Sequence, residues 1–392
     1  MSPLISSDVG VLTVLVGTCA FFFFVENTTR WRVFRFLPPL VFIYLVPVIF
    51  SNTGVLPSQS DVYTSIRSFI LPMMLVLLLL KVDVGAAIRV MGRGVFVMLI
   101  GTLGVMLGAP IAYLLVSRWL SPEAWKAFGT LAGSWIGGTG NMAGVSEMID
   151  ARGTEFGLAV LGDTTIYMIW LPIMLGSKKL AGRFARFTGV SAERFKRMEQ
   201  AAAELDRDDR TPALHDYLYL LFIALCASWT SDLIATWLPE REPLVSEGTW
   251  RILCITTIGI GLSFTPARRI PGSHAFAMAL VYLFVARMGA SAELAGVTEQ
   301  AIPFLVGALF WIFFHGGFCL VGAKLLKVDI HTAAIASAAN IGGAASAPIV
   351  AAHHKQSLVP ASVLMALVGY AVGNYAGYIT AQLCRLAALL VQ

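Results

Sequence analysis

Long apolar runs alternate with short polar loops along almost the whole chain. Crossing a bilayer takes about 20 residues of apolar helix. Runs approaching or exceeding that length fall near 9–25, 36–51, 67–81, 94–117, 126–148, 156–176, 216–238, 250–265, 272–290, 301–323, 331–352 and 358–384. The pattern predicts an all-α integral membrane protein with about 10–12 transmembrane helices.

Two of these runs are interrupted in the middle by glycines and polar residues. One contains Gly133–Met142 (GSWIGGTGNM) and the other Ala339–Pro348 (ANIGGAASAP). Glycine costs about 1 kcal/mol relative to alanine inside a helix, and in lipid every freed backbone group needs a partner. Such segments are tolerated where protein shields them or where they line a polar cavity. We therefore expect two structural repeats, each with a broken mid-membrane helix, as in many transporters.

A polar stretch, Ser177–His215, separates the two halves. It divides the chain into a first transmembrane repeat (1–176, interrupted near 133–142), a connector (177–215) and a second repeat (216–392, interrupted near 339–348). The connector is first basic and then acidic, and Ser191 can cap a short helix running to about Leu205. We interpret it as a cytoplasmic connector; the alternative is a regulatory or lipid-contacting segment.

The basic loops do not agree with a simple count of crossings. Clusters within 30–35, 81–93, 178–197 and 268–269 should all be cytoplasmic. Placing both 81–93 and the connector inside needs an even number of crossings between them, but three apolar runs lie there. An inverted repeat would also need an odd offset between the interrupted runs, whereas the count gives six. At least one run therefore does not cross as counted, and the topology stays open.

Composition supports a membrane protein throughout, with 57% hydrophobic and 13% charged residues and a mean hydropathy of +0.76. Soluble proteins average about 25% charged residues. The net charge of +5 is ordinary for basic cytoplasmic loops, so it indicates no nucleic-acid function. Five scattered cysteines lack metal-ligand spacing and are expected to be small buried hydrophobes.

Asp163 is the sharpest single candidate for chemistry. It lies inside an apolar run, where a carboxylate costs roughly 2.5–3.5 kcal/mol on insertion scales. The functional interpretation is a cation site or proton carrier; the alternative is a structural partner for a buried amide or lysine. Asn141, Thr139 and the carbonyls of Gly137, Gly138 and Gly140 would complete a cation site where the helix unwinds.

A second group of polar residues could form a substrate site or second half-site. Its members are Ser134, Asn340, Ser337, Ser346, Tyr370 and Asn374. Half-helix N-termini at the interruptions would favour an anionic substrate group. The alternative is helix packing, because small residues let helix backbones approach closely. Packing explains the glycines and alanines well but the asparagines poorly.

Other polar residues carry weaker signals. His315, inside an apolar run, is a candidate proton relay or a satisfied hydrogen-bond partner between helices. His353 and His354 beside Lys355 are expected to be solvated in a loop. Glu147 and Asp150 share a helix face near the end of a run, where we expect water.

The interrupted segments and Leu367–Tyr375 (LVGYAVGNY) resemble the YjcL-like family of membrane proteins, catalogued as domain of unknown function 819. The resemblance covers essentially the whole chain, with Thr139-Gly140 standing where Ser-Ala is expected. The family is distantly similar to the cation:proton antiporter and bile-acid:sodium symporter superfamily. That similarity implies a panel domain and a core domain, elevator-like transport, Asn141 and Asn340 near the crossover, and Asp163 as the carboxylate on the next helix.

The leading hypothesis is a secondary active transporter of the bacterial inner membrane that uses Na⁺ or H⁺ to move a small organic solute. The first alternative is a Na⁺/H⁺ antiporter, and the second is a non-transporting sensor or scaffold. No P-loop, HExxH motif or nucleophile elbow is present, so we expect no enzyme activity. We expect no cofactor or metal beyond the coupling ion, the lipid bilayer and a small molecule as partners, and by analogy a homodimer.

Overall fold

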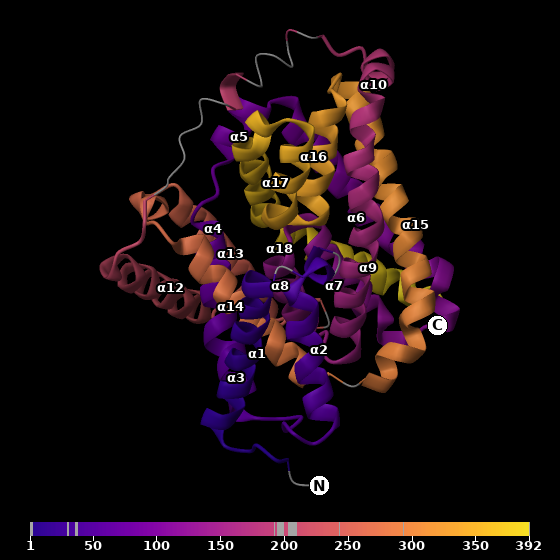
Figure 1. Ribbon diagram of the computed structural model, residues 1–392. Coiled ribbons are helices and arrows are strands. Elements are labelled where there is room, and N and C mark those ends of the chain that lie inside the picture. Colours follow the sequence, from indigo (N-terminus) through magenta and orange to yellow (C-terminus); the bar gives the residue numbers. More distant parts are fainter. Residues whose placement is uncertain are drawn as a thin grey trace.

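The computed structural model describes residues 3–29, 31–35, 38–191, 193, 200–202, 210–242, 244–292 and 294–391. Its helices are α1 (Asp8–Thr29), α2 (Pro39–Asn52), α3 (Asp61–Ser65), α4 (Leu71–Leu79), α5 (Val84–Met91), α6 (Arg93–Val116), α7 (Trp125–Gly137), α8 (Thr139–Met148), α9 (Thr154–Ser177), α10 (Ala181–Thr188), α12 (Leu214–Ala235), α13 (Glu247–Ser263), α14 (Ser273–Ala290), α15 (Leu294–Leu326), α16 (Ile330–Ile341), α17 (Gly343–His354) and α18 (Val359–Leu389) (Figure 1).

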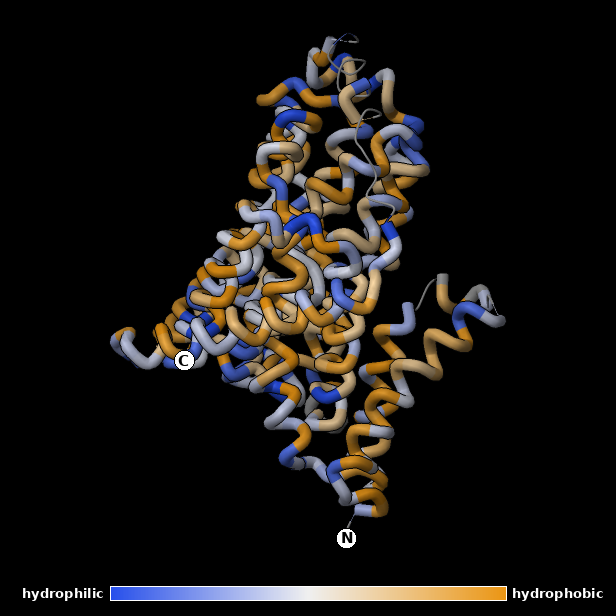
Figure 2. Tube along the Cα trace, turned by 90° about the vertical axis from the view of Figure 1, so that its left-hand side faces the viewer, coloured by the Kyte–Doolittle hydropathy of each residue, from blue (hydrophilic) through white to orange (hydrophobic). Residues whose placement is uncertain are grey.

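The prediction of an all-α membrane protein is confirmed. Within the described residues, eight helical segments are long and apolar enough to cross a membrane, and one of them joins α3 to α4 through a π-helical turn (Ile66–Ile70). The shorter α2 and α13 also run through the bundle. Hydrophobic residues extend along most of the helices (Figure 2). Large side chains such as Phe222 and Trp229 of α12, and Trp237 just after it, are exposed. Exposed apolar side chains of this kind are suited to lipid contact.

Hydrogen bonds between loops identify two ends of the bundle. At one end, which we call the basic end, side chains of basic residues join loops that are far apart in sequence. These bonds are Arg93 Nη1 to Leu326 O at 3.0 Å, Lys178 Nζ to His353 O at 2.7 Å, Arg210 Nη2 to Arg269 O at 2.5 Å and Arg268 Nη1 to Asp83 Oδ2 at 3.0 Å. By the positive-inside rule, this is the end that we expect to face the cytoplasm.

A second set of bonds joins the loops at the opposite end. These bonds are Leu4 N to Gly54 O at 2.9 Å, Asn52 Nδ2 to Ala292 O at 2.8 Å, Ser121 N to Gln300 Oε1 at 2.7 Å and Thr249 Oγ1 to Met148 O at 3.0 Å. Each of the long helices, and α2 and α13, therefore begins at one end and finishes at the other.

The first interrupted run is a helical hairpin. The chain breaks at Gly138, whose φ of +77° and ψ of −177° belong to a region that glycine alone adopts readily. The two legs then pack against each other. A Cβ atom at Gly133 of α7 would lie 2.8 Å from Asn141 O, and one at Gly129 would lie 3.1 Å from Cδ1 of Ile149, just past α8. The first hairpin therefore begins and finishes at the end opposite the basic end.

The second interrupted run folds in the same way from the basic end. It breaks at Gly342, and α17 runs back beside α16. Ser346 Oγ donates to Ala338 O at 3.5 Å near the tip. At the base, Nδ1 of His331 and Nδ1 of His354 are 2.9 Å apart. Figure 1 shows the two legs side by side.

The hairpins correct the count of crossings. The helix breaks appear in the predicted segments, but the runs 126–148 and 331–352 turn back at their tips and do not cross. Only α6 and α9 then cross between 81–93 and the connector, so both of these basic segments lie at one end. Sequence alone could not show the reversal, because a broken helix and a hairpin have the same apolar length.

Helix contacts divide the bundle into two groups. In the first group, α1, α2, α4, α12, α13 and α14 pack mainly on one another. In the second group, α6, α7, α8, α9, α15, α16, α17 and α18 do the same. The groups meet chiefly where α8 and α18 contact α4 and α13.

The first part of the predicted connector is helical. The short amphipathic helix α10 follows α9 almost directly and ends at Gly189, which has φ of +67°. Lys324 Nζ lies 4.7 Å from the ring centroid of Phe187 on this helix. Much of the helix predicted from Ser191 to Leu205 lies outside the described residues, as do the acidic residues Glu199, Glu204, Asp206, Asp208 and Asp209 and the basic residues Arg30, Arg194, Lys196 and Arg197.

Candidate functional site

The tips of the two hairpins meet inside the protein. A Cβ atom at Gly343 would lie 3.5 Å from the Cα of Gly138, and one at Gly138 would lie 3.1 Å from Cε1 of Tyr370. The Tyr370 ring of α18 therefore lies against both tips. Its hydroxyl interacts with the backbone of Ala344 in the first turn of α17. Two segments some 200 residues apart thus form one junction, which we call the tip junction (Gly138, Gly343 and Tyr370).

Asp163 of α9 lies beside the first hairpin. Its carboxyl group faces the side chains of Ser134 and Trp135 on α7. Asp163 Oδ1 and Trp135 Nε1 are both buried, and among the described residues neither makes a hydrogen bond of ordinary geometry. Buried polar atoms are nearly always paired, so two orphaned atoms this close together mark a place where a polar ligand, ion or water would fit.

Tyr167 extends this site toward the second hairpin. It follows Asp163 by one helical turn on α9, and its ring lies 3.2 Å from where a Cβ atom of Gly342 would be. Its side chain also interacts with Ser346 of α17. The Tyr167 hydroxyl is buried and makes no hydrogen bond of ordinary geometry to any described residue. Asp163, Tyr167, Ser134, Trp135 and Ser346 therefore form a continuous polar site beside the tip junction.

The backbone at the tips adds complementary partial charges. Helices α8 and α17 begin at Thr139 and Gly343, so their positive N-terminal ends point into the junction, while α7 and α16 finish there with their negative C-terminal ends. Carbonyls at Gly137 and Ile341 could help to hold a cation with Asp163. The two N-termini could hold an anionic group.

The predicted asparagines make bonds to neighbouring helices. Asn141 Nδ2 donates to Tyr370 O at 3.0 Å. Asn340 Nδ2 donates to Met98 O of α6 at 2.9 Å, and Asn374 Nδ2 donates to Thr256 Oγ1 of α13 at 2.7 Å. Asn141 lies one turn beyond the tip, whereas Asn340 and Asn374 bond away from it. Asn374 Oδ1 is buried and has no hydrogen-bond partner among the described residues.

Gly140, placed in the cation site by sequence, lies at the boundary between the helix groups. A Cβ atom there would collide with Leu78 of α4. Its small size therefore serves the close contact of α8 with α4.

His315 and Ser337 belong to a closed hydrogen-bond chain. His315 Nδ1 is 2.9 Å from Gly101 O and can only donate to it, so Nε2 accepts from Ser337 Oγ at 3.0 Å. Ser337 Oγ in turn accepts from Trp170 Nε1 at 2.9 Å. Every member has a partner, which favours the alternative of a neutral, satisfied histidine that joins α6, α9, α15 and α16.

Replacing Ser337 with alanine is expected to lower the melting temperature by several degrees. It leaves Trp170 Nε1 without a partner and His315 Nε2 with only Cys319 Sγ, a weak donor at 3.5 Å, and a buried group left unpaired costs about 1–3 kcal/mol. Thermal unfolding of the purified protein measures the loss. Ser362→Ala is the matched control, because this buried hydroxyl donates only to Val359 O in its own helix. Equal losses in the two variants would contradict the bridging role of Ser337.

Two expectations about solvated residues are wrong. His354 is buried, and its Nε2 donates to Met174 O at 2.9 Å, so it closes the base of the second hairpin onto α9. The Glu147 side chain is 10% exposed and forms an ion pair with Arg67. Both residues lie at hairpin bases, where other elements cover them: α9 contacts His354, and the π-helical turn contacts Glu147.

Sequence reasoning missed Trp135 and Tyr167 as members of the site. Tyr167 had a usable signal, because residues four apart share a helix face and Asp163 was already a candidate. Trp135 had none, since a tryptophan in an apolar run is ordinarily a packing residue.

Comparisons with known proteins agree that the chain is a membrane protein. The family model described as "Protein of unknown function (DUF819)" matches residues 13–386. The "Uncharacterized membrane protein YjcL" of Bacillus subtilis (strain 168) is 25% identical over 340 residues, which covers 84% of this chain and 85% of the relative. The match includes both hairpins and the helices around the tip junction. The chain belongs to the DUF819 family of membrane proteins.

Proposed function

We propose that this protein is a secondary active transporter of the bacterial inner membrane. It would use a Na⁺ or H⁺ gradient to move a small organic solute by elevator-like alternating access. The observation that carries the proposal is the meeting of two hairpin tips beside a buried carboxylate with an unpaired oxygen. A charged group inside a membrane segment is costly and by default marks a pathway for ions or substrate.

The order of elements supports alternating access. In the first half, α1, α2 and α3–α4 precede α6, the first hairpin and α9. In the second half, α12, α13 and α14 precede α15, the second hairpin and α18. The hairpins enter from opposite ends, as an inverted repeat requires, so each could control access from its own side. The first helix group would be the panel that stays fixed, and the second would be the core that moves.

The site suggests how the roles divide. Asp163, with the carbonyls of the first hairpin tip, would bind Na⁺ or carry a proton. The N-termini of α8 and α17 would hold an anionic group of the solute, with Tyr167 and Ser346 as polar neighbours. Tyr370 would link occupation of the site to both tips, because its ring lies against both.

Replacing Asp163 with asparagine is expected to abolish stabilisation by Na⁺. Binding to the folded state stabilises it by about 2.7 kcal/mol at a hundredfold excess over the dissociation constant. Melting temperature is measured for the wild type and Asp163→Asn in K⁺ buffer with and without Na⁺, and Asp61→Asn on the surface is the control. A Na⁺-specific rise that only Asp163→Asn loses supports the sodium site.

Other outcomes redirect or contradict the assignment. Equal rises in all three proteins would remove Asp163 from the site. If Na⁺ gives no rise, proteoliposomes would be tested for proton-driven uptake across a library of organic solutes. Exchange of Na⁺ for H⁺ with no organic solute present would identify the antiporter alternative. The sensor alternative holds if replacing the connector with a neutral linker changes the cellular phenotype and Asp163→Asn does not.

A further inference from the structure

Arg287 on α14 is a buried cation that forms no hydrogen bond with an oxygen atom of the described residues. The residue is 6% exposed, and its Nε is buried with no hydrogen bond. Its Nη1 lies 2.8 Å from the sulfur of Met288, a weak acceptor. Within the described part of the chain, no carboxylate forms an ion pair with it. A guanidinium carries five N–H donors, so Arg287 has most of its hydrogen-bonding capacity unused.

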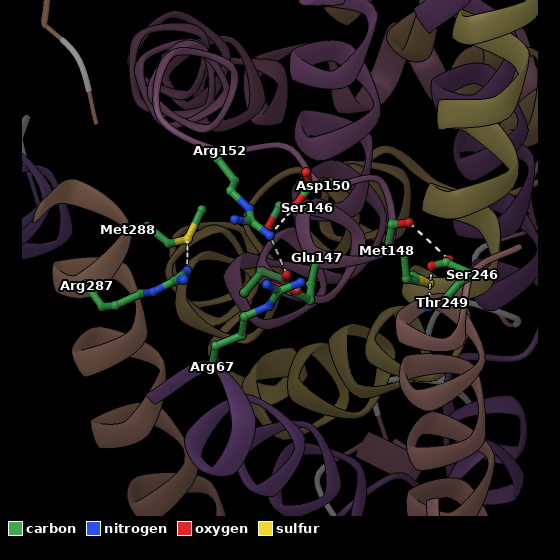
Figure 3. Close-up of polar contacts among 11 residues, drawn as sticks. Arg67, Ser146, Glu147, Met148, Asp150, Arg152, Ser246, Thr249, Arg287 and Met288 are labelled. Carbon is green, nitrogen blue, oxygen red and sulfur yellow. Dashed lines mark hydrogen bonds and ion pairs between the residues drawn. The ribbon is translucent and has the colours of Figure 1, made fainter. Parts of the chain in front are cut away.

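Other charged residues surround Arg287 at the end opposite the basic end. Figure 3 shows Arg67, Arg152 and Arg287 extending from different elements toward one region around Glu147. Glu147 forms an ion pair with Arg67, and Arg152 forms one with Asp150 at 2.5 Å. Glu147, Arg67 and Arg152 all act electrostatically on Arg287. Three guanidinium groups thus share two carboxylates, and the region has an excess of positive charge.

A purely structural role explains this arrangement poorly. A buried charge without a partner destabilises the folded state, and a similarly long apolar residue such as methionine would pack there without that cost. Arg67 lies on the π-helical turn, Ile66–Ile70. Such turns are often found at functional sites. An unpaired buried guanidinium beside a π-helical turn therefore suggests a ligand.

We infer that Arg287 and Arg67 form a binding site for a small anion bearing a carboxylate or a similar oxyanion. The site lies where the second leg of the first hairpin, α8, meets α4 and α14. Glu147 supplies a carboxylate to Arg67 in this structure and so competes with the ligand for that arginine. Guanidinium groups bind planar oxyanions through paired hydrogen bonds, which suits a carboxylate and also a phosphate.

This site is separate from the tip junction and does not depend on the proposed function. It is at the opposite end of the protein from the basic end, near the loops that hold Asp150 and Ser246 (Figure 3). An anion arriving from that side would meet it before reaching the hairpin tips.

The test measures melting temperature of the purified full chain against anion concentration. The probes are sodium succinate and sodium phosphate, each compared with sodium chloride at equal ionic strength. The proteins are wild type, Arg287→Met, Arg287→Lys, Glu147→Gln and the control Arg118→Met. Arg118 is near the same end but stacks on Trp119, at 3.8 Å from the ring centroid, outside the cluster.

The site predicts a saturable rise of several degrees in wild type and Arg118→Met. Arg287→Met should start at an equal or higher melting temperature and lose the rise, because the methionine removes both the buried charge and the site. Arg287→Lys keeps the charge but loses the planar guanidinium that binds an oxyanion through two hydrogen bonds. The same rise in melting temperature should therefore need about tenfold more anion. Glu147→Gln should respond at about tenfold less anion, because the competitor is gone. A response to succinate alone identifies an organic acid as ligand, and a response to phosphate alone an inorganic oxyanion.

Three results would overturn the inference. One is a wild-type protein with no saturable response to either probe. The second is a response of equal size in Arg287→Met. The third is an Arg287→Met protein that melts at a lower temperature than wild type and keeps the anion response, since that combination marks Arg287 as structural. If Arg287→Met does not fold, the wild-type and Arg287→Lys titrations decide.

Discussion

Cysteines introduced at Glu123 and Arg152 are expected to react with a membrane-impermeant maleimide from the same side of the membrane. These residues flank the first hairpin at its two bases, and both are exposed. A hairpin returns the chain to the side it came from, whereas a crossing helix would place the two cysteines on opposite sides. Labelling of intact cells and of inverted vesicles, in a variant lacking the five native cysteines, measures the sidedness.

The second hairpin supplies the matched control from the other side. Cysteines at Lys327 and Gln356 should both react only in inverted vesicles, because the positive-inside rule predicts that the basic loops of this end face the cytoplasm. The expected effect is all or none. If the two cysteines of one pair were labelled from opposite sides of the membrane, the segment between them would cross it. The hairpin tips could then not meet as described.

Replacing Gly138 with alanine is expected to abolish the response to Na⁺ and to destabilise the protein. The backbone at Gly138 is in a region nearly closed to residues with a Cβ atom, so the strain alone costs about 1–3 kcal/mol. The new methyl would also lie 3.1 Å from Cε1 of Tyr370, so the ring that lies against both tips would have to shift. Melting temperature with and without Na⁺ measures both effects.

Gly176→Ala is the control for Gly138→Ala. Gly176 is on α9, and a Cβ atom there meets nothing within 4 Å. This change should leave the Na⁺ response intact and stabilise the helix by about 0.5–1 kcal/mol. If Gly138→Ala behaves like Gly176→Ala, the backbone at the tip has no role in binding, and the proposed site would reduce to the side chains around Asp163.

Local features of the sequence were enough to predict the fold class and the positions of the two helix breaks. Apolar runs of bilayer length determine that the chain is helical and membrane-embedded, because lipid leaves the backbone no other partners. Glycines at 137–138 and 342–343 determine where two of those helices break. Asp163 could be picked out as a candidate from sequence because it stands among apolar neighbours, and a carboxylate in such a segment is costly in lipid.

The tertiary structure alone decided which way the chain turns after each break and which polar groups keep a partner. Hairpin and crossing helix have the same apolar pattern, and only packing of α7 on α8 and of α16 on α17 distinguishes them. Asn340 and His315 resemble site residues in sequence, yet contacts from α6 satisfy both of them. In sequence, Arg287 resembles an ordinary arginine at the end of a helix. Its burial without a carboxylate partner appears only in the tertiary structure, where α14 packs beside α8. Pairing of polar groups depends on residues distant in sequence, so it cannot be derived from a local pattern.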